Sequence, residues 1–256
     1  MPQKPLSPKL SQLFWVLSGL VIGNAVLAEL LGMKIFSLAR IFDIPSFTTS
    51  GFLSLTFDFN MSVGILIWPF VFVISDLINE YFGKAGVRKV SFFTAAIILY
   101  GFIFIYFATS LPGADFWLQI NNTDNSGVAF DISYAYNVVF RQSAGIILGS
   151  VTAFLLSQLI DAYTFQYLKN ITGHKKLWLR ATGSTVISQF VDSFVILFIA
   201  FYILGNWSMT QVITVGIAQY LYKIIIAIVL TPVIYLAHHL IDKYLGNEHP
   251  GAENLQ

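Results

Sequence analysis

Six long runs of apolar residues restrict what this chain can fold into more than any other feature. A helix that crosses the hydrocarbon core of a bilayer needs about 20 consecutive, mostly apolar residues. We therefore expect spanning helices over residues 13–33, 62–82, 91–111, 134–165, 181–204 and 212–241. This pattern predicts an all-α integral membrane protein with six transmembrane helices.

Composition excludes the main alternatives. Only 11% of the 256 residues are charged, whereas a soluble domain carries about 25%. A soluble globule could not cover its surface with so few polar side chains, and a chain that is 56% hydrophobic is too apolar for disorder. There is no cysteine and the net charge is +1, so neither a disulfide framework nor a nucleic-acid-binding domain is expected. Without a metal-protease motif or a phosphate loop, we expect no metal, no cofactor and no enzymatic activity.

We interpret residues 1–245 as a single membrane domain and residues 246–256 as a polar tail. The run 134–165 is too long for a perpendicular helix, so it should tilt or project beyond the bilayer. Pro45, Gly51 and polar residues interrupt the stretch 35–59, which favours an extracellular hairpin or a re-entrant segment.

Lysine and arginine residues predict the orientation, because cytoplasmic loops carry an excess of them. With the N-terminus inside, only Lys34 and Arg40 lie outside. The cytoplasmic set is Lys4, Lys9, Lys84, Arg88, Lys89, Lys169, Lys175, Lys176, Arg180 and Lys243. Both termini should therefore be cytoplasmic.

Ionisable side chains inside the predicted spans indicate a polar interior, since a charge at the bilayer centre costs from about 2.5 to more than 10 kcal/mol. They are Asp76, Glu80, Arg141, Asp161, Asp192 and Lys223. We expect Asp76, Asp192 and Lys223 to face a central cavity, whereas Glu29 is nearer a helix end and should reach the interface. The alternative is a set of buried ion pairs that fix helix packing, with Glu80 paired to Lys84 one turn on.

Two of these groups should form a pair. Asp192 and Lys223 each lie about eleven residues into their spans, which places both near the middle of the bilayer at about 1.5 Å per residue. We expect each to neutralise the other when the cavity is empty.

A polar stripe runs along the fifth predicted span. Thr185, Ser188, Gln189 and Asp192 fall within an arc of about 100° on a helix. These groups could hydrogen-bond a planar polar ligand, or they could bond neighbouring helices at roughly 0.6 kcal/mol per pair. Pro69 interrupts the second span, and interrupted membrane helices often lie beside transporter sites. Gly145 and Gly149 favour close helix packing.

Three segments together resemble the queuosine precursor transporter family, also called the vitamin uptake transporter family. The first contains Trp68-Pro69, the residues Ser75-Asp76-Leu77-Ile78-Asn79-Glu80-Tyr81-Phe82-Gly83, and Arg88. The second runs from Arg141 through Ser157-Gln158-Leu159-Ile160-Asp161, Phe165, Leu177-Trp178-Leu179-Arg180, Gly183-Ser184-Thr185 and Ser188-Gln189 to Asp192. The third contains Tyr222-Lys223 and Thr231-Pro232-Val233-Ile234-Tyr235. The match covers most of residues 64–244.

The resemblance implies import of 7-deazaguanine bases, which are queuosine precursors used in tRNA modification. These are the cyano- and aminomethyl-deazaguanines, with queuine as a further candidate. It also implies a bacterial inner-membrane location and a fold similar to the substrate-binding subunits of energy-coupling-factor vitamin transporters. One alternative is therefore a binding subunit that depends on a separate ATP-driven module, and another is a membrane enzyme acting through an aspartate pair. The sequence does not show which base is preferred, which energy source drives transport or whether the protein forms a homodimer.

The residues suit such a substrate. A guanine-like edge presents adjacent N–H donors, and one carboxylate accepts both. Flat bases also stack on aromatic rings. The candidate substrate-binding residues are Trp68, Phe72, Asp76, Asn79, Glu80, Arg141, Gln158, Asp161, Ser188, Gln189, Asp192, Tyr220 and Lys223, with Asp76 and Asp192 the main candidates for the base edge.

Overall fold

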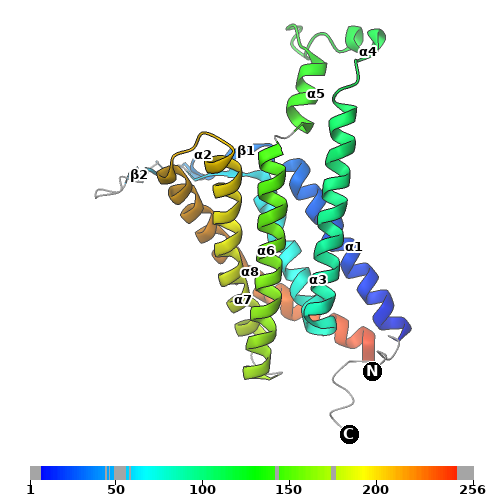
Figure 1. Cartoon of the computed structure of the whole chain (residues 1–256), viewed down its shortest axis with the longest axis vertical. Coiled ribbons are helices and arrows are strands. Elements are labelled where there is room, and N and C mark those ends of the chain that lie inside the picture. The colour runs from blue at the N-terminus through cyan, green and yellow to red at the C-terminus, as the bar shows by residue number, and fades with distance from the viewer. Residues whose placement is uncertain are drawn as a thin grey trace.

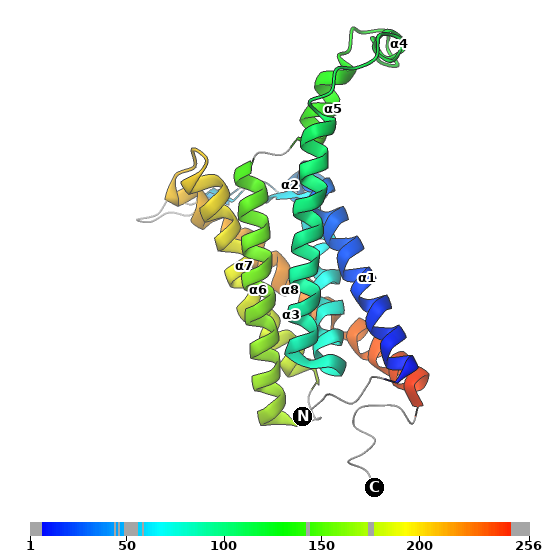
Figure 2. The same ribbon diagram turned by 45° about the vertical axis from the view of Figure 1, so that its right-hand side comes forward.

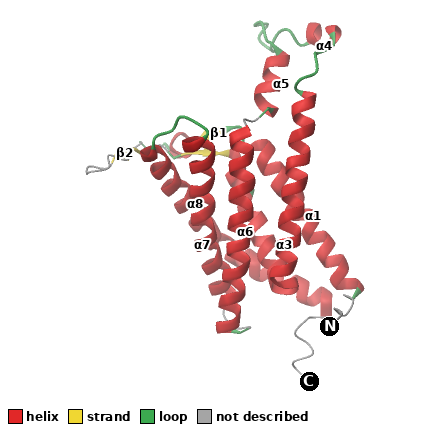
Figure 3. Ribbon diagram, in the orientation of Figure 1, coloured by secondary structure: helices red, strands yellow, loops and turns green. Residues whose placement is uncertain are grey.

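Long apolar helices make up most of the described chain (Figure 3). The structure, a computed structural model, describes residues 7–43, 45, 47, 48, 56, 57, 59–141, 144–173 and 177–246. Within these residues, five helical stretches are long and apolar enough to cross a membrane. They are α1 (Pro8–Leu31), α3 (Trp68–Ala108), α5 with α6 (Ile132–Phe140 and Ala144–Thr172), α7 with the π-helix η2 (Leu177–Leu197 and Phe198–Ile203) and α8 (Met209–Leu245). The predicted all-α membrane class is confirmed.

A sharp turn at Gly83 divides α3 into two helices. The residue has φ 66° and ψ −178°, a conformation that is accessible essentially only to glycine. Before the turn the chain runs antiparallel to α1, since Gly64 lies against Gly32 and the Phe82 ring lies 5.0 Å from the Phe14 ring. After the turn it runs back along α1 toward α4 (Asp115–Ile120; Figures 1 and 2). The turn divides this stretch into two apolar helices, and the number of membrane crossings stays a prediction.

Small strands and short helices gather at one end of the bundle, which we call the loop end. There β1 (Ile35–Ser37) pairs antiparallel with β4 (Asn60–Ser62), and β2 (Phe47–Thr48) with β3 (Thr56–Phe57). The helix α2 (Leu38–Phe42) and the 3-10 helix η1 (Val63–Leu66) lie in the same region. The paired strands agree with a hairpin in the stretch 35–59.

The predicted fourth span is divided. The helix α5 ends at Phe140, Arg141 has non-helical dihedrals, and α6 begins at Ala144. As expected for so long a run, its first part projects beyond the bundle, where α5 and α4 extend past the other helices (Figures 1 and 2).

The opposite end, which we call the terminal end, brings together the first and last described helices. Lys9 Nζ donates to the Tyr244 carbonyl at 3.1 Å, and the Tyr244 hydroxyl donates to Gln12 at 2.9 Å. The beginning of α1 and the end of α8 therefore lie on the same side of the bundle.

Close packing positions α6 against α7 and η2. A Cβ at Gly149 would lie 2.9 Å from the Ala200 Cβ, and one at Gly145 would lie 3.1 Å from the Leu204 Cβ. This confirms that the Gly145 and Gly149 pair serves helix packing. The resulting close approach fixes which faces of α6 and α7 point inward.

Candidate functional site

The bundle contains a wide, partly open chamber toward the loop end. Its volume is about 780 Å³, which falls within the range of ligand pockets, roughly 300–1,000 Å³. The lining includes Glu29, Asn60, Trp68, Ser150, Asp192, Gln211, Gln219 and Lys223. These side chains come from α1, β4, α3, α6, α7 and α8, so α1 contributes to the cavity although none of the predicted substrate-binding residues lies on it.

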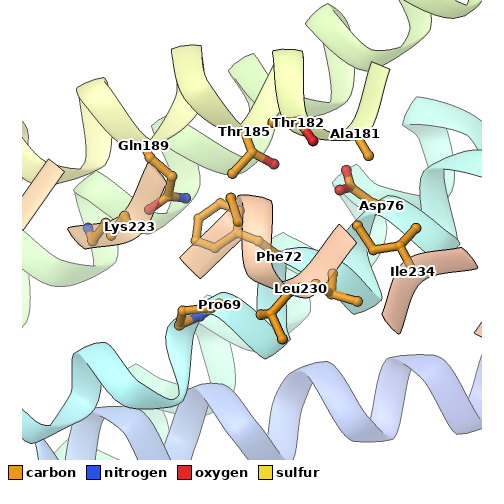
Figure 4. Close-up of a pocket in the computed structure, with 12 residues that line it drawn as sticks. Pro69, Phe72, Asp76, Ala181, Thr182, Thr185, Gln189, Lys223, Leu230 and Ile234 are labelled. Carbon is orange, nitrogen blue, oxygen red and sulfur yellow. The ribbon is translucent and has the colours of Figure 1, made fainter. Parts of the chain in front are cut away.

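A narrow pocket continues toward the terminal end. It is lined by Pro69, Phe72, Val73, Asp76, Ala181, Thr182, Thr185, Gln189, Lys223, Ala227, Leu230 and Ile234. Figure 4 shows Lys223 and Gln189 near one end of this pocket and Asp76 near the other. Its free volume is about 20 Å³, and one water needs roughly 10–15 Å³ measured in this way. The pocket can therefore hold a water molecule but not a nucleobase.

An ion pair lies between the two cavities. Lys223 Nζ donates to Asp192 Oδ2 at 2.5 Å, and the Ser157 hydroxyl donates to Asp192 Oδ1 at 3.2 Å. Lys223 lines both cavities, whereas Asp192 lines the chamber. The predicted pairing of Asp192 with Lys223 is confirmed. Asp76, Asp192 and Lys223 do not face one common cavity, because Asp76 lines only the narrow pocket and Asp192 only the chamber.

The chamber holds a second carboxylate, Glu29, which was expected at the membrane interface. Glu29 is only 7% exposed, and the Ser150 hydroxyl donates to its Oε2 at 3.0 Å. The signal in the sequence that could have indicated this position is a carboxylate near the end of the first apolar run. The expectation that Glu29 reaches the interface is wrong, because α1 packs against α3 and turns Glu29 into the chamber.

An aromatic side chain borders the same chamber. Trp68 is half-buried, and its ring centroid lies 5.4 Å from that of the buried Phe154. Pro69, the next residue, occupies the first turn of α3 and not its interior. Proline is tolerated at that position, so Pro69 does not break α3. The second predicted span is interrupted instead where η1 ends and α3 begins. This transition places Trp68 at the chamber wall.

Asp76 and Asp161 meet in the interior. Their exposures are 2% and 1%, and their carboxyl groups are near enough to repel one another when both are ionised. The Ser188 hydroxyl donates to Asp161 Oδ1 at 2.9 Å. Asp76 lines the narrow pocket, but Asp161 and Ser188 lie outside the lining of both cavities. The polar stripe on α7 is thus split, with Thr185 and Gln189 on the narrow pocket.

A buried ionic cluster joins helices at the terminal end. Arg180 donates to Glu80 Oε1 at 2.9 Å and to the Gly173 carbonyl at 2.7 Å, and Lys169 lies 3.2 Å from the same Glu80 oxygen. The cluster forms instead of a pair between Glu80 and Lys84, whose ammonium lies over the Tyr163 ring at 4.7 Å. Glu80 therefore connects α3, α6 and α7 and does not line either cavity.

Two predicted amides also connect helices. Asn79 donates to the Ala162 carbonyl at 3.1 Å and accepts from Gln166 at 2.8 Å. Gln158 accepts from Ser75 at 2.6 Å. Both are almost completely buried and lie outside the lining of the two cavities.

The two remaining candidates lie away from the cavities. Arg141 is exposed, with its guanidinium 4.5 Å from the centre of the Tyr106 ring. Tyr220 donates to the Val186 carbonyl at 3.1 Å, and its ring packs edge-on against Phe190. The structure does not bring Arg141 or Tyr220 to the chamber or the pocket.

Comparison with known proteins places the chain in a family. The profile of the family described as "Putative vitamin uptake transporter" matches residues 62–237, which is more than half of the chain. The chain belongs to this family. The matched region begins at Ser62, the last residue of β4, and ends in α8. It therefore contains the lining of both cavities except for the chamber residues that precede Ser62.

Three curated proteins are similar over most of the chain. A "Probable queuosine precursor transporter" of Bacillus subtilis is 27% identical, with 72% of this chain and 75% of that protein covered. A protein of the same name from Haemophilus influenzae is 29% identical, with coverages of 68% and 66%. The "Queuosine precursor transporter" of Escherichia coli is 25% identical, with coverages of 67% and 69%. No solved structure matches.

Proposed function

We propose that this chain imports queuosine precursors, the 7-deazaguanine bases, across the bacterial inner membrane. The names of the three similar transporters support the substrate class. The membership of the family supports transport by a membrane-embedded carrier. The substrate would leave the protein chemically unchanged.

The observation that carries the proposal is the chemistry of the wide chamber. It has the volume for a base, two carboxylates at Glu29 and Asp192, and an aromatic wall at Trp68. A carboxylate matches the adjacent N–H donors of a guanine-like edge, and an indole ring stacks on a flat base. The base would therefore bind in the chamber with its edge toward a carboxylate.

This assignment revises which carboxylates are candidates for the base edge. Asp76 and Asp161 belong to or lie behind the narrow pocket, whose free volume of about 20 Å³ admits no base. Asp192 stays a candidate, and Glu29 joins it. Gln219 and Gln211, which also line the chamber, would bond the remaining ring acceptors.

The proposed orientation places the chamber on the outer side. Lys34 and Arg40 belong to the loop end, whereas Lys9, Lys84, Lys169 and Lys243 lie in the helix ends and turn of the terminal end. The excess of basic residues favours a cytoplasmic terminal end. The chamber would then receive substrate from outside, while contacts such as that of Arg180 with Glu80 keep the terminal end closed.

Uptake by the purified protein in lipid vesicles tests the proposal. Vesicles without nucleotide should take up 7-cyano- or 7-aminomethyl-7-deazaguanine, and mass spectrometry should recover the base unaltered. Titration with both bases, queuine and guanine would rank the substrates. Binding without uptake, followed by uptake once an ATP-driven module is added, would instead support a binding subunit. Recovery of an altered base would indicate an enzyme.

A further inference from the structure

Two buried acids outside the proposed base site form a carboxyl pair. Asp76 on α3 and Asp161 on α6 are 2% and 1% exposed, and their carboxyl groups are near enough to repel one another when both are ionised. An ionised carboxylate has only acceptors, so two ionised groups cannot bond one another. Two ionised groups would also repel one another in this buried site, which favours a proton on one of the two acids. We call Asp76 and Asp161 the carboxyl pair.

The surrounding cations are engaged elsewhere. On α7 and α6, Arg180 and Lys169 contact Glu80 of α3, and on α8 Lys223 contacts Asp192 of α7. Among the residues that the structure describes, neither member of the carboxyl pair has an ion-pair partner. The Arg180 guanidinium also attracts Asp76, but it is bonded to Glu80. Two adjacent negative charges without an ion-pair partner of their own are strongly unfavourable in a buried site, so the surroundings favour retention of one proton.

The narrow pocket beside the carboxyl pair is lined by two residues with polar atoms that lack hydrogen-bond partners. Asp76 Oδ1 and Gln189 Nε2 are fully buried and have no hydrogen-bond partner within the described part of the chain. Both residues line the pocket (Figure 4), which has room for about one water molecule. Lys223 lines the same pocket and the chamber, so the pocket lies between the carboxyl pair and the proposed base site.

We propose that the carboxyl pair is a proton-binding site that couples import to the proton gradient. One proton enters from the chamber through the narrow pocket and adds to a carboxylate of the pair. The same proton leaves toward the terminal end when the carrier releases its base there, so the pair is restored after each cycle. This inference rests on the proposed function, because it assigns an energy source to that transport.

Proton movement in the unmodified protein is the first test. Vesicles containing the purified carrier and a pH-sensitive dye are held at zero membrane potential, and 7-cyano-7-deazaguanine is added outside. The vesicle interior should acidify as the base enters. A gradient of one pH unit, acid outside, should drive about tenfold accumulation if one proton accompanies each base.

Neutral variants of the carboxyl pair locate the site. Asp161→Asn and Asp76→Asn replace an acid by an amide that cannot release a proton. Each should lose gradient-driven accumulation and base-dependent acidification, yet still exchange internal labelled base for external unlabelled base. Exchange persists because it requires no net proton movement. Asp115→Asn, at the exposed start of α4, is the matched control and should accumulate the base like the parent.

The outcomes separate this inference from the proposed function. A parent protein that neither imports nor exchanges the base would refute the transport itself. Import without acidification and without response to the gradient would overturn the proton site alone. Coupling that persists in both folded Asn variants would also overturn it. If one variant does not yield monodisperse protein, the other variant and the measurements on the parent still decide.

Discussion

Lys223 Nζ lies 2.5 Å from Asp192 Oδ2, and this ion pair stands where the wide chamber meets the narrow pocket. The side chains are 6% and 15% exposed, so the pair is largely removed from solvent. Its position divides the interior into a part that can hold a base and a part that can hold only water.

Breaking the ion pair should destabilise the carrier and impair uptake. Lys223→Met leaves Asp192 without its cation, and removal of one partner from a buried pair costs about 3–5 kcal/mol. Thermal unfolding in detergent should show a lower midpoint, and vesicle uptake should fall. Lys243→Met, which removes an exposed lysine at the end of α8, should change neither.

A double variant separates stability from transport. Lys223→Met with Asp192→Leu removes both charges, and replacement of a whole buried pair by apolar groups is often neutral. The double variant should regain thermal stability but not uptake. A Lys223→Met protein with normal stability and normal uptake would contradict the assigned role.

Glu29→Gln should weaken binding of guanine-type bases. An amide presents a donor where the carboxylate presents an acceptor, which leaves a mismatch of about 1–3 kcal/mol, or roughly 5- to 150-fold in affinity. The loss should be smaller for 7-deazahypoxanthine, which lacks the exocyclic amine. Calorimetric titration with both ligands provides the measurement. Equal losses for both would indicate a structural glutamate bonded to Ser150.

Trp68→Ala should weaken binding of every base, whatever its edge groups. Loss of a stacking ring costs about 1–3 kcal/mol per base, and the effect should be similar for 7-deazaguanine and 7-deazahypoxanthine. Trp68→Phe keeps an aromatic face and should recover most of the affinity. If Trp68→Phe is as weak as Trp68→Ala although both fold, packing against Phe154 and not stacking on the base would explain the effect.

Gly83→Ala should destabilise the turn between the two halves of α3. No atom lies within 4 Å of a Cβ placed there, so the cost comes from the backbone at φ 66°. Such strain amounts to about 1–3 kcal/mol. Gly101→Ala is the matched control, since it also has open space but lies within a regular helix, where alanine is preferred to glycine by about 0.5–1 kcal/mol. The two midpoints of thermal unfolding should therefore move in opposite directions.

The sequence by itself determined the class of the protein and much of its polar interior. Apolar runs long enough to span a bilayer require helices, because every backbone polar group must be satisfied within the segment. Equal depth in two spans was sufficient to predict the pair of Asp192 with Lys223. The cost of a charge in lipid was sufficient to place Asp76 inside the bundle.

Only the tertiary structure decided which interior volume each side chain faces. Depth along a helix does not specify its rotation, and rotation depends on contacts such as those of Gly149 with Ala200 and of Glu80 with Arg180. In the same way, the packing of α1 against α3 turns Glu29 into the chamber and that of α3 against α6 brings Asp161 to Asp76, although neither relationship is encoded in local spacing. They arise because residues far apart in the chain must share one closely packed interior.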